Sequence, residues 1–201
     1  GHGPSGACIR TLRSRRAMGD SAPGGRRPEA ASLPAEYTVT WLEMTARSRT
    51  PVPAAPSGMA LALLTAENPP THWFLYLYRK VGEAYLWDDW IAASEAERAA
   101  FVGDPEVTLH TLFVDGAPGG FFMLDTREKA RCDLAYFGLM PEAVGRGLGH
   151  WFLMTAVDAA WQRPGVERMT VNTCTLDHPR ALGNYQKAGF VPVRRETRPL
   201  R

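Results

Sequence analysis

A glycine-rich turn offers the most recognisable chemistry in this sequence. Gly145, Gly147 and Gly149 stand between an apolar stretch over residues 134–139 and a segment with helical periodicity. A helix N-terminus presents unpaired backbone N–H groups and a partial positive charge, and glycine lets an anion come close to the main chain. The spacing therefore predicts a phosphate-binding turn between a strand and a helix.

Phosphate-binding turns are told apart by the residues around their glycines. A P-loop requires lysine and then a hydroxyl residue after its last glycine, and neither follows here. A dinucleotide-binding turn requires G-x-G-x-x-G/A; Gly145 and Gly147 fit, but His150 occupies the last position. That turn also opens an all-parallel βαβ unit, whereas this one follows segments that look like an antiparallel meander. A third type of phosphate-binding turn is the one that binds acetyl-CoA.

The turn resembles the motif Q/R-x-x-G-x-G/A of the GNAT superfamily of N-acetyltransferases. Gly147 and Gly149 match its second half, and Val144 stands where Gln or Arg is usual. The family binds the pyrophosphate mainly through backbone N–H groups, so a valine at this position does not remove the match.

A second block, residues 178–190, resembles the family's N-x-x-A-x-x-x-Y-x-x-x-G-F signature. His178 replaces the usual Asn. The remaining positions match, with Ala181, Tyr185, Gly189 and Phe190 in place. The resemblance covers about residues 37–196. The nearest subgroup is small bacterial GNAT proteins that carry Y-F-G-L-x-P-E and T-C-T-L-D-H-P, whose substrates are mostly unassigned.

The resemblance implies an α/β GNAT fold, with a mixed central sheet of about six to seven strands and flanking helices. It also implies transfer of an acetyl group from acetyl-CoA to an amine by direct attack. Tyr185 would be the general acid, since the family points this hydroxyl at the CoA sulfur; the alternative is a core tyrosine beside Phe190. Asp133 would be the general base, since some protein-acetylating members carry a glutamate there. The alternatives are a solvated carboxylate at a strand edge, or a water chain as the base.

The cofactor contacts follow from the same resemblance. Residues 137–139 would present main-chain groups to the pantetheine arm and the acetyl carbonyl, and Gly138 permits the bulge that the family has in this strand. An N–H group there would stabilise the oxyanion. The expected cofactor-binding residues are Phe137, Gly138, Leu139, Val144, Gly145, Arg146, Gly147, Leu148, Gly149, His150, Asn184 and Lys187. No metal is expected.

Other reactive or aromatic residues have plainer explanations. Cys174 has no base placed beside it by the sequence, so a buried structural thiol is expected. His178 directly precedes Pro179 and is expected to cap a helix. Five aromatic residues either pack in the core or line the acceptor site: Trp73, Tyr76, Tyr85, Trp87 and Trp90. Three carboxylates are candidates for binding a cationic substrate near its mouth: Glu83, Asp88 and Asp89.

Periodicity and turn residues predict the elements that position these groups. Strands are expected over residues 37–44, 59–65, 107–114, 120–125, 132–139, 168–174 and 190–195. Helices are expected over residues 71–82 and 94–103, from Gly147 to Pro164, and from Pro179 to Gly189. The strand over 168–174 follows a helical crossover, so it should run parallel to the strand over 132–139.

Local signals refine these boundaries. Ser94 and Glu97 have the capping-box spacing, and Thr71 is a plausible helix cap. Residues 115–119 should form a hairpin turn.

Composition divides the chain into a tail and one domain. Residues 1–35 are rich in Gly, Pro, Ser and Arg and are expected to be a disordered tail, with residues 36–201 forming the acetyltransferase domain. The first 30 residues hold six arginines and two carboxylates; taking these from the 23 basic and 21 acidic residues leaves 17 and 19, a net charge of −2 for residues 31–201. The folded part is therefore not a basic nucleic-acid surface. No apolar run approaches the ~18 residues of a membrane span.

The sequence leaves several questions of function open. A non-catalytic acyl-CoA-binding or sensor module would keep the same cofactor motifs, and an Arg-rich arm for nucleic acid is a third hypothesis, disfavoured by the charge of the remainder. The expected partner is a small-molecule or peptide amine, with no nucleic acid and no membrane, and the protein is expected to be a monomer or homodimer. Three cysteines without metal-ligand spacing are typical of reduced thiols, which predicts a cytoplasmic protein.

Overall fold

Alternating and helical patterns along the chain give seven strands and a set of short helices in the computed structural model, which describes residues 34–200. The predicted tail, residues 1–35, lies almost entirely outside the described residues. The strands are β1 Glu36–Met44, β2 Leu61–Glu67, β3 Val107–Val114, β4 Ala117–Asp125, β5 Arg131–Leu139, β6 Arg168–Cys174 and β7 Val191–Pro199. The α-helices are α1 Thr71–Gly82, α2 Asp89–Ala92, α3 Glu95–Val102, α4 Gly149–Trp161 and α5 Ala181–Lys187, with 3-10 turns at η1 Glu83–Tyr85 and η2 Pro141–Ala143.

The strands form one mixed sheet in the order β2-β3-β4-β5-β6-β1-β7. Every neighbouring pair is antiparallel except β5 and β6, which α4 connects as a parallel pair. This confirms the predicted crossover and the predicted mixed sheet of six to seven strands. The parallel pairing covers only three positions, from Arg131 with Arg168 to Asp133 with Thr170. Beyond these positions β5 is paired with β4 alone.

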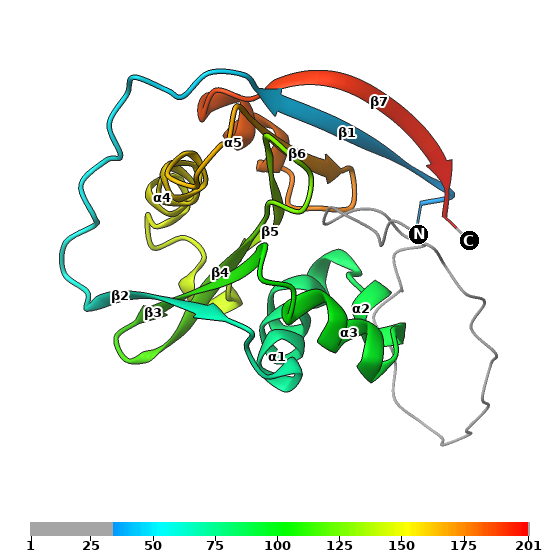
Figure 1. Ribbon diagram of the computed structural model, residues 1–201, viewed down its shortest axis with the longest axis horizontal. Coiled ribbons are helices and arrows are strands. Elements are labelled where there is room, and N and C mark those ends of the chain that lie inside the picture. Colours follow the sequence, from blue (N-terminus) through cyan, green and yellow to red (C-terminus); the bar gives the residue numbers. More distant parts are fainter. Residues whose placement is uncertain (1–33, 201) are drawn as a thin grey trace, which may run out of the picture.

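Helices cover both faces of the sheet (Figure 1), because each presents an apolar side to it. On one face, Phe152 of α4 packs against Phe122 and Phe137, with ring centroids 5.4 and 5.2 Å apart. On the other face, Phe74 of α1 packs 6.2 Å from the ring of Tyr136. Each fully buried aromatic side chain contributes roughly 2–3 kcal/mol of hydrophobic stabilisation. The two layers therefore hold β5 between them.

A β-bulge in β5 decides which of its side chains face α1–α3. Leu134 pairs with Leu124, and the next paired residue, Tyr136, lies opposite Met123. Ala135 is the extra residue, so Asp133 and Tyr136 lie on the same face of the sheet. The prediction of a bulge at Gly138 was wrong, because Gly138 is in regular register with Phe121.

Gly138 is required for a different reason. A Cβ atom at this position would lie 2.2 Å from Cγ1 of Val81, so glycine allows α1 to pack directly on β5. The close approach brings the end of α1 to the edge of β5, where residues 137–139 end the strand.

Several local predictions are confirmed and others need correction. The capping box at Ser94 is present, with its hydroxyl accepting from the Glu97 N–H and the Glu97 carboxylate accepting from the Ser94 N–H. Thr71 does not cap α1; Pro70 holds that position, and the Thr71 hydroxyl donates to Glu95.

Two predicted boundaries also shift. The hairpin turn is only Asp115 and Gly116, both with positive φ, because Ala117 already pairs with Val114. Pro179 precedes α5, which begins at Ala181, and Nδ1 of His178 accepts from the Arg180 N–H at 3.1 Å. The N-cap of α5 is Arg180 and no side chain caps this helix, so the expectation that His178 caps it is wrong; the His178 ring instead supports the turn before α5.

The two cysteines of the described part differ in chemical state. Cys132 is a free thiol on β5, and burial raises its pKa to about 12. Cys174 is disulfide-bonded, so the expectation of reduced thiols is wrong at this position. Within residues 34–200, no helix is long and apolar enough to cross a membrane.

His110 on β3 is a buried titratable group whose protonation affects the stability of the fold. Its ring nitrogens make hydrogen bonds of 2.9 and 3.0 Å with the hydroxyls of Thr65 and Thr108, and its ring stacks on Phe122. Burial, with a smaller effect from the charge of Arg163, lowers its pKa from 6.5 to about 4. His110 is therefore neutral in the folded protein at neutral pH.

This burial predicts a pH-dependent stability. The unfolded chain binds more protons than the folded chain between pH 6.5 and about 4, so the His110 contribution to the unfolding free energy is lost as the pH falls through that range. His110→Gln removes this contribution, which is at most about 3 kcal/mol. Urea unfolding near neutral pH and at about pH 4.5 should show that the variant loses less stability than the parent. His72→Gln, at an exposed histidine, is the matched control substitution. If His110→Gln and the parent lost the same unfolding free energy between the two pH values, the result would contradict a buried, neutral His110.

Candidate active site

A cavity of about 420 Å³ opens where β5 and β6 are no longer paired. Its wall combines the end of α1 and η1, the end of β5, the glycine turn with the start of α4, and the segment from β6 into α5. The lining residues are Val81, Tyr85, Trp87, Phe137, Gly138, Leu139, Val144, Gly145, Gly147, Leu148, Gly149, His150, Leu153, Asp177, His178, Arg180, Ala181, Asn184 and Tyr185. One cavity thus joins the two sequence blocks that predicted the site.

The glycine turn presents backbone to this cavity. Gly145 and Gly147 have φ values of +81° and +79°, which other residues rarely adopt. A Cβ atom added at Gly145, Gly147 or Gly149 would meet nothing within 4 Å, so the space above the turn is open. The first hydrogen bond of α4 is donated by Phe152 to Leu148, and no bond within the described residues uses the N–H groups of residues 145–150. Free N–H groups at the start of a 13-residue helix form an anion-binding surface.

Most of the predicted cofactor residues line the cavity. Ten of the twelve do so: Phe137, Gly138, Leu139, Val144, Gly145, Gly147, Leu148, Gly149, His150 and Asn184. Val144, which departs from the family motif, is exposed, and its N–H is bonded to the carbonyls of Met140 and Pro141. The Val144 N–H is therefore already used within the protein, and the N–H groups left free at the turn are those of residues 145–150.

Two predicted cofactor residues, Arg146 and Lys187, are not on the cavity wall. The Arg146 guanidinium donates to Asp115 over 2.7 Å, and this bond holds the pKa of Asp115 below its usual value. Asp115 also accepts from the Ala60 N–H at 2.9 Å. In this structure Arg146 therefore ties the glycine turn to the β3–β4 hairpin.

Tyr185, the predicted acid, lies on the cavity wall next to Phe190, whose ring it meets edge-on at 5.9 Å. Its side chain is largely buried, and no hydrogen bond within the described residues uses its hydroxyl. Burial raises the pKa of Tyr185, and the negative charges of Asp177 and Asp133 raise it further. The hydroxyl is therefore protonated at neutral pH and can donate a hydrogen bond into the cavity.

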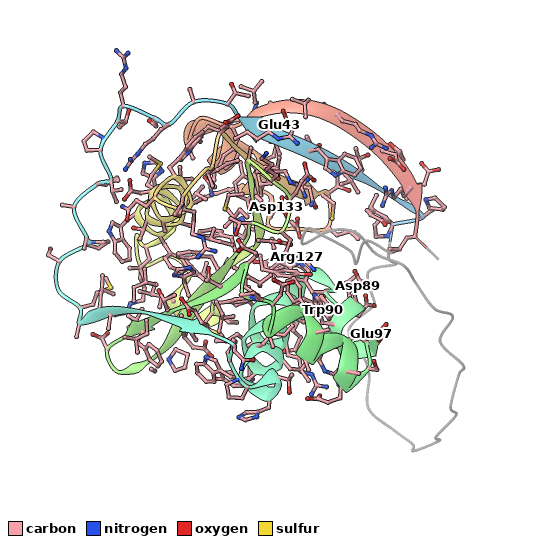
Figure 2. All side chains as sticks on the ribbon, viewed as in Figure 1. Glu43, Asp89, Trp90, Glu97, Arg127 and Asp133 are labelled. Atoms are coloured by element: carbon pink, nitrogen blue, oxygen red, sulfur yellow. The ribbon has the colours of Figure 1, made fainter. Side chains whose placement is uncertain are left out.

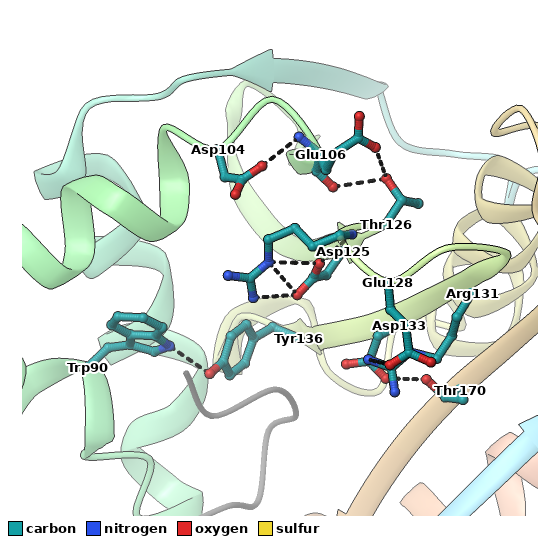
Figure 3. Close-up of polar contacts among 11 residues, drawn as sticks. Trp90, Asp104, Glu106, Asp125, Thr126, Glu128, Arg131, Asp133, Tyr136 and Thr170 are labelled. Atoms are coloured by element: carbon teal, nitrogen blue, oxygen red, sulfur yellow. Dashed lines mark hydrogen bonds and ion pairs between the residues drawn. The ribbon is translucent and has the colours of Figure 1, made fainter. Parts of the chain in front are cut away.

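Asp133, the predicted base, lies at the last paired position of β5 and β6, inside the molecule (Figures 2 and 3). The Thr170 hydroxyl donates to its Oδ1 at 2.5 Å, while Oδ2 is buried without a hydrogen-bond partner in the described residues. Burial raises its pKa to about 6, against the lowering effects of Thr170 and Arg131. Asp133 is not a solvated edge carboxylate, but it does not line the cavity either.

The structure adds a carboxylate that sequence reasoning missed. Asp177 lines the cavity between β6 and α5. Its Oδ1 accepts from the indole N–H of Trp87 at 3.2 Å, and its Oδ2 accepts from the Thr173 hydroxyl at 2.7 Å and the Cys174 N–H at 3.0 Å. These bonds link the two sides of the cavity. The T-C-T-L-D-H-P segment was the available signal, but a bond between residues 90 positions apart has no sequence pattern.

The aromatic residues divide between the cavity and the core. Tyr85 and Trp87 line the cavity. Trp90 is buried and donates to the Tyr136 hydroxyl at 2.6 Å (Figure 3), while Trp73 stacks on Tyr76 and Phe113 away from the cavity wall. The other suggested carboxylates, Glu83, Asp88 and Asp89, do not line the cavity. Among the residues that line the cavity, Asp177 carries a carboxylate and Arg180 carries a guanidinium group.

Known proteins share this architecture. A solved GCN5-related N-acetyltransferase from Kribbella flavida is 16% identical, with a TM-score of 0.52 over 77% of this chain and 54% of its own. Another from Sphaerobacter thermophilus is 19% identical, with a TM-score of 0.53 over 81% and 50%. A tandem GNAT protein from the clavulanic acid biosynthesis pathway is 18% identical, with a TM-score of 0.54 over 82% and 53%. The chain spans about half the length of these proteins, and at this identity the likeness shows the fold.

Sequence comparison gives the family. None of the curated proteins compared with this chain matches it. The family model for the acetyltransferase (GNAT) family matches residues 62–190. Because this match takes in well over half of the chain, and runs from β2 past the end of α5, the protein belongs to the GNAT acetyltransferase family.

Proposed function

We propose that this protein transfers an acetyl group from acetyl-CoA to the amine of a small molecule or peptide by direct attack. The observation that carries the proposal is the single cavity that connects the free N–H groups of the glycine turn with the hydroxyl-bearing side chain of Tyr185. An anion site and a proton donor on one wall match a substrate that has a diphosphate at one end and a thioester at the other.

The residues of the turn fit an acetyl-CoA diphosphate. The open space above Gly145, Gly147 and Gly149 would be filled by any side chain, and the free N–H groups there would donate to phosphate oxygens. Arg180, on the same wall, would add a positive charge. Residues 137–139 would hold the pantetheine arm along the unpaired edge of β5. When bound, acetyl-CoA supplies the activated acetyl carbonyl.

The reaction requires one proton to leave the amine and one to reach the sulfur. A lysine-like amine has a pKa of ~10 and is mostly a cation at neutral pH, so it must lose a proton before it attacks. The C–N bond forms as the C–S bond breaks, and the CoA sulfur leaves as a thiolate that resembles cysteine, pKa ~8.5. The protein must therefore accept one proton and stabilise one developing anion.

Tyr185 is the group we assign to the thiolate. Its raised pKa keeps the hydroxyl protonated, so it donates a hydrogen bond to the sulfur as negative charge develops there. Asp133 is the group we assign to the amine proton, since a pKa of about 6 lets it be ionised, yet basic, at neutral pH. Because Asp133 is not on the cavity wall, it would receive the proton through a water.

A test of the acid combines binding and turnover. We expect acetyl-CoA to bind and to release free thiol in the presence of at least one member of an amine panel. Tyr185→Phe removes only the hydroxyl and should lower the turnover number roughly a hundredfold with little change in acetyl-CoA affinity. Tyr76→Phe, at an exposed tyrosine away from the cavity, should match the parent. Acetyl-CoA binding without thiol release on any amine, and without any effect of Tyr185→Phe, would indicate a non-catalytic acyl-CoA sensor.

A test of the base uses pH. The rate of acetyl transfer should rise with pH as Asp133 ionises around pH 6. Asp133→Asn should abolish this rising limb of the pH–rate profile and lower the rate roughly a hundredfold. Asp158→Asn on the outer side of α4 is the matched control. A pH profile for Asp133→Asn that keeps the parent's limb would assign proton removal to water or another group.

Asp133→Asn should also change the stability of the protein. The folded pKa of Asp133 is raised above its ordinary value of 3.8, so its contribution to stability is most favourable below that pH and is lost as the pH rises through about 6. Asp133→Asn should therefore raise the unfolding free energy near neutral pH, by at most about 3 kcal/mol. An unchanged or lower stability in urea unfolding would show that the carboxylate is not destabilising when charged.

A further inference from the structure

The two edges of the sheet are built differently. β2 lies at one end of the strand order and β7 at the other (Figure 1). β7 carries three arginines, one glutamate and two prolines, and a bulge interrupts its pairing with β1. β2 has no proline and no basic residue, and its register with β3 is regular. Charges, prolines and bulges keep an edge strand from pairing with another chain, so β7 is protected against such pairing and β2 is not.

The register of β2 shows which of its backbone groups are free. The Asp115 N–H donates to the Ala60 carbonyl at 2.8 Å, and the pairing of β2 with β3 continues from there without a shift. Hydrogen-bonded residues alternate along an antiparallel pair, so the even-numbered residues of β2 bond to β3. The N–H and C=O groups of the odd-numbered residues point away from β3, and no hydrogen bond within residues 34–200 uses them. These residues are Leu61, Leu63, Thr65 and Glu67.

The surface beside this free edge is apolar. Leu64 is opposite Thr111, whose hydroxyl accepts from the Trp73 indole N–H at 3.3 Å, so Leu64 lies on the α1 side of the sheet. Leu64 is 59% exposed and Tyr76 is 42% exposed. The Trp73 ring stacks on both Tyr76 and Phe113, with centroids 5.6 and 6.4 Å apart, which joins α1 to β3 through three aromatic rings. Exposed apolar side chains next to an unpaired strand edge are typical of a surface that associates.

A second copy of this chain matches the edge in both hydrogen bonding and charge. With a two-fold axis at Leu64, Leu61 lies opposite Glu67 of the second copy and Leu63 lies opposite its Thr65, so free N–H and C=O groups meet free groups. Leu64 then faces its own counterpart at a non-hydrogen-bonded position, where side chains come closest. Glu67 is the one charged residue of β2, and it faces a leucine, so no like charges meet across the joint.

We propose that β2 is a dimerisation edge, through which two copies of this chain pair antiparallel about an axis at Leu64. The two seven-stranded sheets become continuous, and Leu64 of each copy covers the joint on the α1 side. β3 and β4 separate β2 from β5, so the dimer leaves the cavity open and does not depend on acetyl transfer. One strand edge gives an interface at the low end of the about 1,200–2,000 Å² of specific complexes, so we expect a Kd of about 10 μM.

Sedimentation velocity tests whether β2 carries the association. The parent should be mostly dimer at about 200 μM and mostly monomer at about 1 μM. Leu64→Lys places like charges opposite each other on the axis and should raise the dimer Kd at least about tenfold. Val193→Lys, at a residue of β7 that is 55% exposed, is the matched control and should leave the Kd unchanged. A parent that is monomeric at the higher concentration would overturn the proposal and leave β2 free for an extended strand of another protein. A dimer that Leu64→Lys does not weaken would also overturn it.

Cysteine cross-linking tests the register. Leu64→Cys brings two thiols directly opposite each other, so mild oxidation should give a covalent dimer above the background of the parent chain. Ala62→Cys lies on the same face but is opposite Ala66 of the second copy, so its own counterpart is four residues away along the strand and should not cross-link. Ala62→Cys combined with Ala66→Cys should restore the covalent dimer. Equal cross-linking by the two single variants, or none by Leu64→Cys, would overturn the pairing about Leu64.

Discussion

The early separation of β5 from β6 is the constraint on which the rest of the site depends. The strands pair at only three positions, and beyond Asp133 and Thr170 the backbone of β5 has an unpaired edge. Unpaired backbone groups inside a protein are costly unless a ligand or water satisfies them. The fold keeps this opening because packing on both faces holds β5 in place, through Phe152 on one side and Phe74 with Val81 on the other.

The opening also explains the unusual electrostatics around it. Asp133 lies where the pairing stops, buried with one oxygen unpartnered, and its pKa is raised for that reason. His110, on the α4 side of the sheet, is buried in the neutral form. The two groups act on stability in opposite directions between about pH 4 and 6, because one takes up a proton readily in the folded state and the other resists it. Asp133, whose charged form is the destabilising one, lies where β5 and β6 separate and is not on the cavity wall.

Much of the fold could be predicted because its signals are local. The alternation of apolar and polar residues predicted the strands, and apolar residues at helical spacing predicted α1 and α4. The helical crossover between β5 and β6 predicted that these two strands are parallel. The glycine turn and Tyr185 were also within reach, since each belongs to a short motif. The bulge at Ala135 was not, because register depends on β4, and neither were the bonds from Arg146 to Asp115 and from Trp87 to Asp177. These contacts join residues that only the finished fold brings together.

We propose that the glycine turn and the end of β5 hold acetyl-CoA in the cavity between β5 and β6. A crystal structure of the protein with acetyl-CoA tests it most directly. We expect diphosphate oxygens within hydrogen-bond distance of the N–H groups of residues 145–150, with the thioester sulfur next to the hydroxyl of Tyr185. A cofactor bound elsewhere, or a diphosphate out of reach of that turn, would contradict it.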